Sequence, residues 1–190
     1  GEARVLGNDS IHFALPTDLV SAPDGSFYVS DGYGNSRVVK YSKDNSFLFD
    51  WGKNGPDRIL NKGTNAGEFN TPHGIDLDEN MNVYVADREN NRIQKFNSKG
   101  NFLAHWQNKS AHQLYSVAVG HKNNYFLAID YDSIAKASNI LRFDFDLNLG
   151  MQFSNPNTRY HDIAIDTEGA IYVGDILNKK IQKFQLVKSE

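Results

Sequence analysis

A pattern that returns four times constrains this chain more than any other feature of its sequence. In its second copy the pattern reads Thr71-Pro-His-Gly-Ile, then Val83-Tyr-Val-Ala-Asp87, then Arg92-Ile-Gln-Lys-Phe96. Its aspartate has counterparts at Asp31, Asp130 and Asp175, so the pattern recurs at intervals of ~40–55 residues. Each segment is short, rich in β-branched and aromatic residues, and bounded by Gly, Asn or Asp. A repeat of this length built from short strands is typical of the blades of a β-propeller.

The four copies predict a single all-β domain over residues 1–190, a four-bladed propeller with its innermost strands near a common axis. Turn signals such as Asp24-Gly25 and Glu168-Gly169 stand where antiparallel strands should join. We expect the blades at residues 15–52, 71–107, 113–154 and 159–186. The fourth unit ends after its third strand. We expect a strand at residues 3–6 to complete it, because closure of the ring removes an exposed sheet edge. The alternative is a fragment of a larger ring.

Composition excludes several classes of function. Lys and Arg total 20 and Asp and Glu total 23, so the net charge is −3. This near-balance argues against nucleic acid as the main partner, because phosphate binding needs a concentrated basic surface. Since there is no cysteine, the chain has no disulfide, no thiolate zinc ligand and no thiol nucleophile. No run approaches the ~20 apolar residues of a membrane helix, so we expect no membrane partner.

Two histidines occupy the same place in their units, at the entry of the innermost strand. They are His73 and His161, while Thr17 and Tyr115 stand there in the other two units. In a four-bladed ring the second and fourth units face each other, so the two imidazoles are expected to converge at one end of the axis. Imidazole is a common zinc ligand. A third ligand would be water, Tyr115, Asp162 or another group. The alternative is that each histidine only makes a hydrogen bond at a strand start.

Tyr33 and Arg88 follow the repeated aspartate in the first and second units, so they are expected at the same rim. A phenol beside a metal or a guanidinium can take a proton from a hydroxyl. The Arg88 guanidinium offers a planar fork to a carboxylate. The alternatives are an exposed loop aromatic for Tyr33 and an ion pair with Glu89 or Asp87 for Arg88.

Regularly placed charged residues on the second and third strands are interpreted as structural. A carboxylate at the end of each second strand can accept backbone N–H bonds in the following turn. These carboxylates, the repeat aspartates, are Asp31, Asp87, Asp130 and Asp175. Cations recur on the third strands, where their stems are expected to cover apolar surface. They are Arg37, Arg92, Arg142 and Lys180.

Several segments resemble one enzyme family. The repeats as a whole resemble NHL repeats. Phe27-Tyr-Val-Ser-Asp-Gly-Tyr-Gly-Asn-Ser-Arg37 and Val85-Ala-Asp-Arg-Glu-Asn-Asn-Arg-Ile-Gln94 are similar to segments of the peptidyl-α-hydroxyglycine α-amidating lyase (peptidylamidoglycolate lyase) family. So are Gly67-Glu-Phe-Asn-Thr-Pro-His73 and the His161-Asp162 pair. The resemblance covers nearly the whole chain and begins at the family's third blade, so the family's first two blades have no counterpart.

The resemblance implies a zinc-dependent, secreted or secretory-lumen lyase with a six-bladed propeller and a structural calcium. Such a lyase splits a peptide ending in α-hydroxyglycine into a peptide amide and glyoxylate. By this resemblance His73 and His161 are zinc ligands, Tyr33 is the catalytic base, and Arg88 is a catalytic residue that binds the substrate carboxylate. Asp162 corresponds to a calcium contact. The family's third zinc histidine and a second arginine belong to the blades without a counterpart.

Three functional hypotheses follow. The first is a metal-dependent lyase acting on peptides with a C-terminal α-hydroxyglycine. The second is a non-catalytic propeller that binds a protein or a small ligand at one rim, because function does not follow from fold. The third is a fragment of a larger six-bladed lyase, or an assembly in which another chain supplies the missing blades. The sequence leaves the oligomeric state open.

Overall fold

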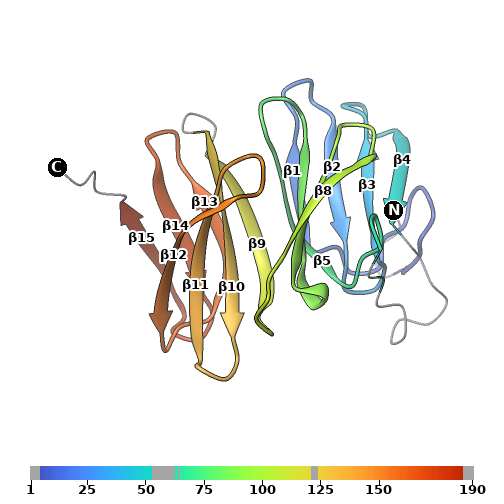
Figure 1. The fold of residues 1–190 in the computed structure, drawn as a ribbon. Coiled ribbons are helices and arrows are strands. Elements are labelled where there is room, and N and C mark those ends of the chain that lie inside the picture. Colours follow the sequence, from blue (N-terminus) through green and yellow to red (C-terminus); the bar gives the residue numbers. More distant parts are fainter. Residues whose placement is uncertain (1–4, 53–62, 64, 121–123, 186–190) are drawn as a thin grey trace.

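The structure is a computed structural model that describes residues 5–52, 63, 65–120 and 124–185. Within these residues the backbone forms four antiparallel sheets that stand side by side (Figure 1). The first three sheets have four strands each and the last has three. In every sheet the strands pair in chain order. This is the four-bladed β-propeller arrangement that the sequence repeat predicts.

Each of the first three blades runs from an inner strand to an outer strand. The first contains β1 (Asp18–Ser21), β2 (Phe27–Asp31), β3 (Arg37–Tyr41) and β4 (Phe47–Gly52). The second contains β5 (Pro72–Leu77), β6 (Val83–Asp87), the short 3-10 helix η1 (Arg88–Asn90), β7 (Arg92–Phe96) and β8 (Phe102–Gln107). The third contains β9 (Gln113–Gly120), β10 (Tyr125–Asp132), β11 (Ala137–Phe143) and β12 (Leu149–Pro156). The fourth contains β13 (Tyr160–Ile165), β14 (Ala170–Asp175) and β15 (Lys180–Gln185).

Hairpin turns form where glycine permits a backbone that other residues rarely adopt. Gly25 has a φ of 83° and Gly169 a φ of 87°. Their amides close the turns by donating to the carbonyls of Ala22 and Asp166. The predicted turn signals at Asp24-Gly25 and Glu168-Gly169 therefore act as sequence-encoded hairpins.

Apolar side chains from neighbouring blades form the core between the sheets. The first and second blades share a cluster that includes Tyr28, Val38 and Phe96. Further clusters join the second blade to the third and the third to the fourth. A fully buried aliphatic or aromatic side chain contributes roughly 1.5–3 kcal/mol. Packing between blades, rather than within one sheet, therefore holds the inner strands in a fixed order.

The repeat aspartates are structural, as predicted, and they do more than cap a turn. Asp87 is fully buried and accepts hydrogen bonds from the Asn70 amide (2.7 Å), the Asn90 side chain (2.8 Å) and Arg92 Nε (2.8 Å). Asp31 likewise accepts hydrogen bonds from the Ala14 amide, the Asn35 side chain and Arg37 Nε. Each of these carboxylates thus ties the segment before the inner strand to the turn and to the third strand.

The interpretation of the third-strand cations as surface cover is wrong for Arg37 and Arg92. Both are buried, with 1% and 2% of their surface exposed. Their guanidinium groups pair with Asp31 and Asp87. Arg37 also donates to the carbonyls of residues 8, 9 and 12. A buried guanidinium requires partners for its donors, and the carboxylate and loop carbonyls provide them.

The prediction that an N-terminal strand closes the last blade is not supported. Residues 3 and 4 lie outside the described residues, and Val5 and Leu6 form no strand. The following segment is held on the first blade, because Asn35 donates to the Gly7 carbonyl and Arg37 to the Asn8 carbonyl. The sheet of β13–β15 keeps three strands among the described residues, and Figure 1 shows β15 and β4 on opposite sides of the molecule.

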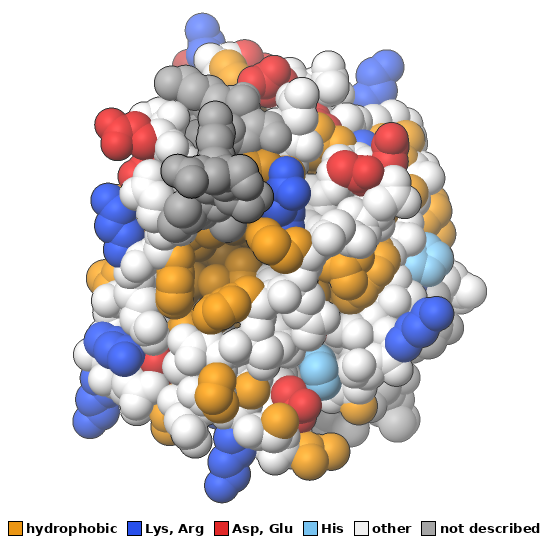
Figure 2. Space-filling model, turned by 60° about the vertical axis from the view of Figure 1, so that its left-hand side comes forward, with side chains coloured by type: hydrophobic (Ala, Val, Ile, Leu, Met, Phe, Trp, Pro, Cys, Tyr) orange, Lys and Arg blue, Asp and Glu red, His pale blue; other side chains and the backbone are white. Residues whose placement is uncertain are grey.

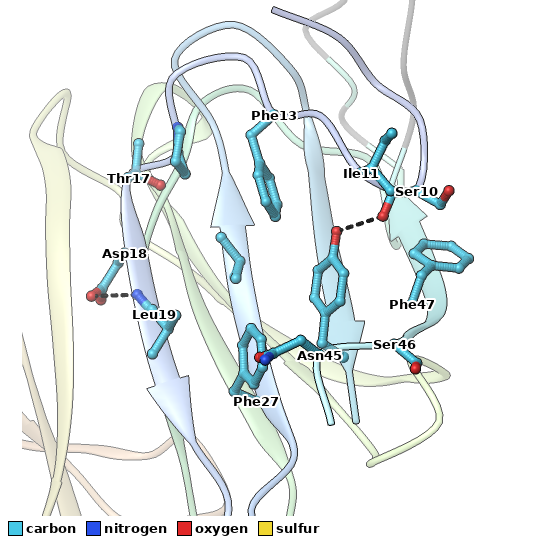
Figure 3. Close-up of a pocket in the computed structure, with 13 residues that line it drawn as sticks. Ser10, Ile11, Phe13, Thr17, Asp18, Leu19, Phe27, Asn45, Ser46 and Phe47 are labelled. Carbon is cyan, nitrogen blue, oxygen red and sulfur yellow. Dashed lines mark hydrogen bonds between the residues drawn. The ribbon is translucent and has the colours of Figure 1, made fainter. Parts of the chain in front are cut away.

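The first blade presents an apolar groove to the outside. The groove has a volume of about 820 Å³ and is lined by Phe13, Leu19, Phe27 and Phe47, among others (Figure 3). Leu19 is 53% exposed. Figure 2 shows another face, with the side of the fourth blade turned forward, where hydrophobic side chains gather around a shallow hollow and charged side chains are scattered about them. The described residues include no helix that is long and apolar enough to cross a membrane.

Candidate functional site

Three inner strands carry a β-bulge at their start. In the pairing of each inner strand with the second strand, one residue is skipped: His73 in β5, Tyr115 in β9 and His161 in β13. A bulge inserts an extra residue and turns its side chain away from the regular alternation. His73, Tyr115 and His161, which occupy the same position in their sequence repeats, therefore also share the same backbone geometry. The bulges direct all three side chains to one end of the axis.

The bulge residues converge with Tyr33 in one cluster of rings. The ring centres of His73 and His161 are 4.8 Å apart, although they belong to the second and fourth blades. Tyr115 lies 5.4 Å from His73 and 5.3 Å from His161. Tyr33, which follows β2, lies 5.4 Å from His73. Residues from all four blades thus meet at one point, and we call Tyr33, His73, Tyr115 and His161 the rim cluster.

Hydrogen bonds define the state of the His73 imidazole. Its Nδ1 lies 2.7 Å from the Tyr115 carbonyl oxygen, and its Nε2 lies 2.9 Å from the Tyr33 hydroxyl. Because a carbonyl can only accept, we assign the ring proton to Nδ1, and Nε2 then accepts from Tyr33. Burial lowers the pKa of His73 to about 4, and the nearby Arg88 charge acts in the same direction. At neutral pH His73 is therefore uncharged, with a lone pair on Nε2.

His161 is less buried and less constrained. Burial lowers its pKa too, and the charges of Arg88 and Arg159 add to this effect. Within the described residues its ring forms no hydrogen bond, in contrast to that of His73. Both nitrogens of His161 are therefore available to a ligand.

Arg88 lies against the cluster at the start of η1. Its guanidinium carbon is 5.4 Å from the ring centres of both Tyr33 and Tyr115. Its Nε donates to Glu89 at 2.8 Å, so the ion pair considered from the sequence is present. Glu89 also accepts two hydrogen bonds from Gln113. The ion pair holds Arg88 at the rim and leaves the far end of its fork directed to other partners.

Arg159 was not among the residues singled out from the sequence, yet it belongs to the site. It lies two residues before His161, and its Nη2 donates to the Tyr115 hydroxyl at 2.8 Å. Its guanidinium carbon is 5.8 Å from the Tyr115 ring centre and 5.1 Å from that of Tyr131. Its position two residues before the predicted ligand His161 was the only signal in the sequence. The second and third units have Thr71 and Gln113 at the same position, so the repeat did not single out an arginine.

Asp162 points away from the histidine that precedes it. Its Oδ1 accepts from the Ser116 hydroxyl and the Ile163 amide, both at 2.8 Å. Together with Asp18 and Asp76 it lines a cavity of about 230 Å³ between the inner strands of all four blades. Burial raises the pKa of Asp18 to about 6, and the charges of Asp162 and Asp76 contribute. A calcium contact at Asp162 stays a prediction.

The rim cluster fits part of a zinc site. Catalytic zinc has three protein ligands and an open position. His73 and His161 supply two imidazoles, and the described residues contain no group of three or more His, Cys, Asp or Glu that could hold a metal. The Nε2 of His73, neutral at pH 7, suits a metal ligand, although the Tyr33 hydroxyl now occupies its lone pair. The described residues therefore provide a two-histidine donor set.

Comparison with known proteins agrees with this fold and finds similarity to NHL-repeat proteins. The NHL repeat model matches residues 13–41 and 69–96. The chain is 31% identical to peptidyl-glycine alpha-amidating monooxygenase A of Xenopus laevis, with all of this chain and 21% of that protein covered. It is 28% identical to a probable peptidyl-alpha-hydroxyglycine alpha-amidating lyase of Caenorhabditis elegans, covering 98% of this chain and 54% of the relative.

The chain is also similar to another NHL-repeat protein and to a solved structure. The chain is 30% identical to NHL repeat-containing protein 3 of Mus musculus, covering 94% of this chain and 52% of that protein. The solved structure of virginiamycin B lyase from Staphylococcus aureus matches with a TM-score of 0.62 at 14% identity, over 90% of this chain and 55% of that one. At that identity the similarity concerns the fold alone. The chain spans about a fifth of the Xenopus laevis monooxygenase and about half of the Caenorhabditis elegans amidating lyase.

Proposed function

We propose that this NHL-repeat β-propeller is a lyase-like protein that acts on peptides ending in α-hydroxyglycine, releasing a peptide amide and glyoxylate. One observation carries the proposal: Tyr33, His73, His161 and Arg88, which are far apart in the sequence, meet at one end of the axis. Relatives named as amidating lyases and monooxygenases support the reaction class. A secretory-pathway location is part of this proposal and rests on the family resemblance.

The reaction moves one proton and breaks one bond. The α-hydroxyl loses its proton, its oxygen becomes the aldehyde oxygen of glyoxylate, and the C–N bond breaks with its electron pair going to the amide nitrogen. That nitrogen then takes up a proton, so the reaction is proton-neutral overall. General bases act through such positioned hydrogen bonds.

The rim cluster offers a path for this proton. The Tyr33 side chain is 47% exposed, so a substrate hydroxyl can reach its oxygen. With zinc on His73 Nε2, the hydrogen bond from Tyr33 to that atom is displaced, and the Tyr33 oxygen, having given up its own proton, would accept the proton of the substrate hydroxyl. The Tyr33 hydroxyl formed in this way would then donate the proton to the amide nitrogen. Arg88, above the Tyr33 ring, would hold the carboxylate of the substrate.

Zinc belongs to this proposal as a ligand of His73 and His161. A bound zinc ion supplies Lewis acidity, which favours loss of the hydroxyl proton. The described residues provide only these two histidine ligands, so a further ligand would come from water or from another part of the protein.

A second candidate is a non-catalytic module that binds a protein or a small ligand at this rim. The incomplete metal donor set of the described residues favours it, because two histidines are fewer than a catalytic zinc site uses. The similarity to NHL repeat-containing protein 3, whose name states no reaction, is compatible with such a role.

The test is glyoxylate release from N-benzoyl-α-hydroxyglycine by this chain, after chelation and after addition of zinc. The proposal expects zinc-dependent release, and none from N-benzoylglycine, which lacks the hydroxyl. No release by folded, zinc-treated protein would exclude catalysis by this chain and favour the binding module.

A further inference from the structure

Arg159 differs from the other arginines near the axis in lacking a carboxylate partner. Arg37 and Arg92 pair with buried aspartates, and Arg88 pairs with Glu89. In the part of the chain that the structure describes, Arg159 forms no ion pair. A guanidinium is charged at every accessible pH and normally collects anionic or carbonyl acceptors. The positive charge of Arg159 is therefore left for a ligand to offset.

The side chain of Arg159 is held in place while part of its donor set stays unused. Its backbone amide donates to Asp175, one of the repeat aspartates, which fixes the position of the residue. Its Nη2 donates to the Tyr115 hydroxyl, and its plane lies near the Tyr131 ring. The Nε is shielded from solvent and has no hydrogen-bond partner among the described residues. A guanidinium that is already positioned costs little to order on binding an anion.

Arg88 and Arg159 lie at the same ring. Their guanidinium carbons are 5.4 Å and 5.8 Å from the centre of Tyr115, which itself lies 5.3 Å from His161. Of these two guanidinium groups, only that of Arg88 has a carboxylate partner among the described residues, namely Glu89, which Gln113 also binds. Two positive groups at one tyrosine ring favour a small anion between them.

We propose that Arg159 and Arg88 together bind the terminal carboxylate of a peptide-like ligand, with Arg159 as a second, specificity-determining arm. This inference deepens the proposed function and rests on the same site, but it requires binding alone and not turnover. Its ligand class is an N-acylated amino acid with a free α-carboxylate. The planar fork of a guanidinium can bind both carboxylate oxygens, so the site should reject an amide at that position.

The experiment measures binding of N-acetylglycine and of its carboxamide, N-acetylglycinamide, to the folded chain by isothermal titration calorimetry. The wild type is expected to bind the acid and not the amide. Arg159→Gln should weaken binding of the acid roughly tenfold or more, because a charged hydrogen bond is lost. Arg159→Lys keeps the charge but not the planar fork, so its affinity for the acid should lie between those of the wild type and Arg159→Gln. Arg142→Gln is the matched control, since Arg142 also has no ion pair with any described residue but lies over the Tyr125 ring in the third blade.

The outcomes separate this inference from the proposed function. Equal affinity of wild type and folded Arg159→Gln for the acid would overturn the role of Arg159, as would equal binding of acid and amide. No binding of the acid by the wild type would overturn it as well. Carboxylate binding that depends on Arg159 without any glyoxylate release would support the inference and contradict the lyase proposal.

Discussion

A repeat aspartate, Asp87, and a histidine of the rim cluster, His161, both occupy regular places in the blades, yet their hydrogen bonding is opposite. Asp87 is buried and accepts four hydrogen bonds from its own blade and the segment before it. His161 occupies an equally regular place, but its ring has no hydrogen-bond partner among the described residues. A polar group whose bonding capacity is filled by the protein stabilises the fold. A group left unfilled at a converging point is available to a ligand.

The backbone explains the difference between the two sets. Asp31, Asp87 and Asp175 end second strands. Backbone amides donate to all three, and guanidinium groups donate to Asp31 and Asp87. Three of the rim residues, His73, Tyr115 and His161, sit on bulges, which release the side chain from the sheet and direct it toward the axis. We therefore expect the repeat aspartates to support stability and the rim cluster to support binding.

The largest effect on stability is expected when a repeat aspartate is removed. Asp87→Ala leaves the buried Arg92 guanidinium without its carboxylate, so the free energy of unfolding should fall by about 3–5 kcal/mol. Urea unfolding would measure it, with the exposed Glu79→Ala as control, where a change within about 0.5 kcal/mol is expected. A loss no larger than that of the control would refute the structural role of Asp87.

Acid should destabilise the metal-free chain through His73. Its pKa is about 4 in the folded state against 6.5 ordinarily, so the unfolded chain binds more protons below pH 6.5. Stability is therefore lost as the pH falls toward 4, by about 2 kcal/mol at pH 5. Urea unfolding at pH 7.5 and pH 5 should show a smaller loss in His73→Gln, and no such reduction in the exposed His105→Gln. Equal pH dependence in both variants would show that His73 is not the buried neutral group described.

Asp18 should change the pH dependence of stability in the opposite direction to His73. Its pKa is raised to about 6, so the folded chain binds the extra proton and gains stability as the pH falls from 7 to 5. This gain is about 1 kcal/mol and is lost again as the pH rises through 6. Comparison of Asp18→Asn with wild type at the two pH values isolates it, with Asp44→Asn as an exposed control. A variant with the wild-type pH dependence would contradict the burial of this carboxylate.

The smallest effect concerns the Tyr33 hydroxyl. It occupies the Nε2 of His73, so a metal at that atom must displace one hydrogen bond. Tyr33→Phe removes this competitor, and zinc should then bind roughly two- to fivefold more tightly. Calorimetric titration with zinc at pH 7.5 would measure the change. Weaker binding in Tyr33→Phe would instead make the Tyr33 oxygen itself a ligand.

The sequence predicted the blades because each strand and turn carries a local signal. Gly25 and Gly169 mark hairpins through their backbone freedom, and alternating apolar residues mark the strands. The proposed closure by residues 3–6 is not seen at Val5 and Leu6, and residues 3 and 4 lie outside the described residues. That closure depended on long-range pairing, which no local signal specifies. The buried guanidinium of Arg37 binds the segment after those residues to the first blade instead.

The site was predicted in part. Equivalent places in the repeat were enough to bring His73 and His161 together, since equivalent residues of a propeller lie at one end of the axis. The Tyr33–His73 hydrogen bond and the approach of Arg159 to Tyr115 depend on side-chain orientation across blades. No spacing within the chain encodes those contacts. The pairing of Arg88 with Glu89 was open in the sequence and is present in the structure together with its contacts to two tyrosines.

The most direct test of the account measures glyoxylate release and unfolding free energy in the same preparations of wild type and His161→Ala. His161 is only half-buried and has no hydrogen bond in the described part of the chain, so its removal should cost the fold little. The account predicts zinc-dependent glyoxylate release by the wild type, its loss in His161→Ala, and an unfolding free energy within about 1 kcal/mol of wild type. Full activity in the variant, or a loss of activity that follows from unfolding, would contradict the claim that the rim cluster is a site and not part of the framework.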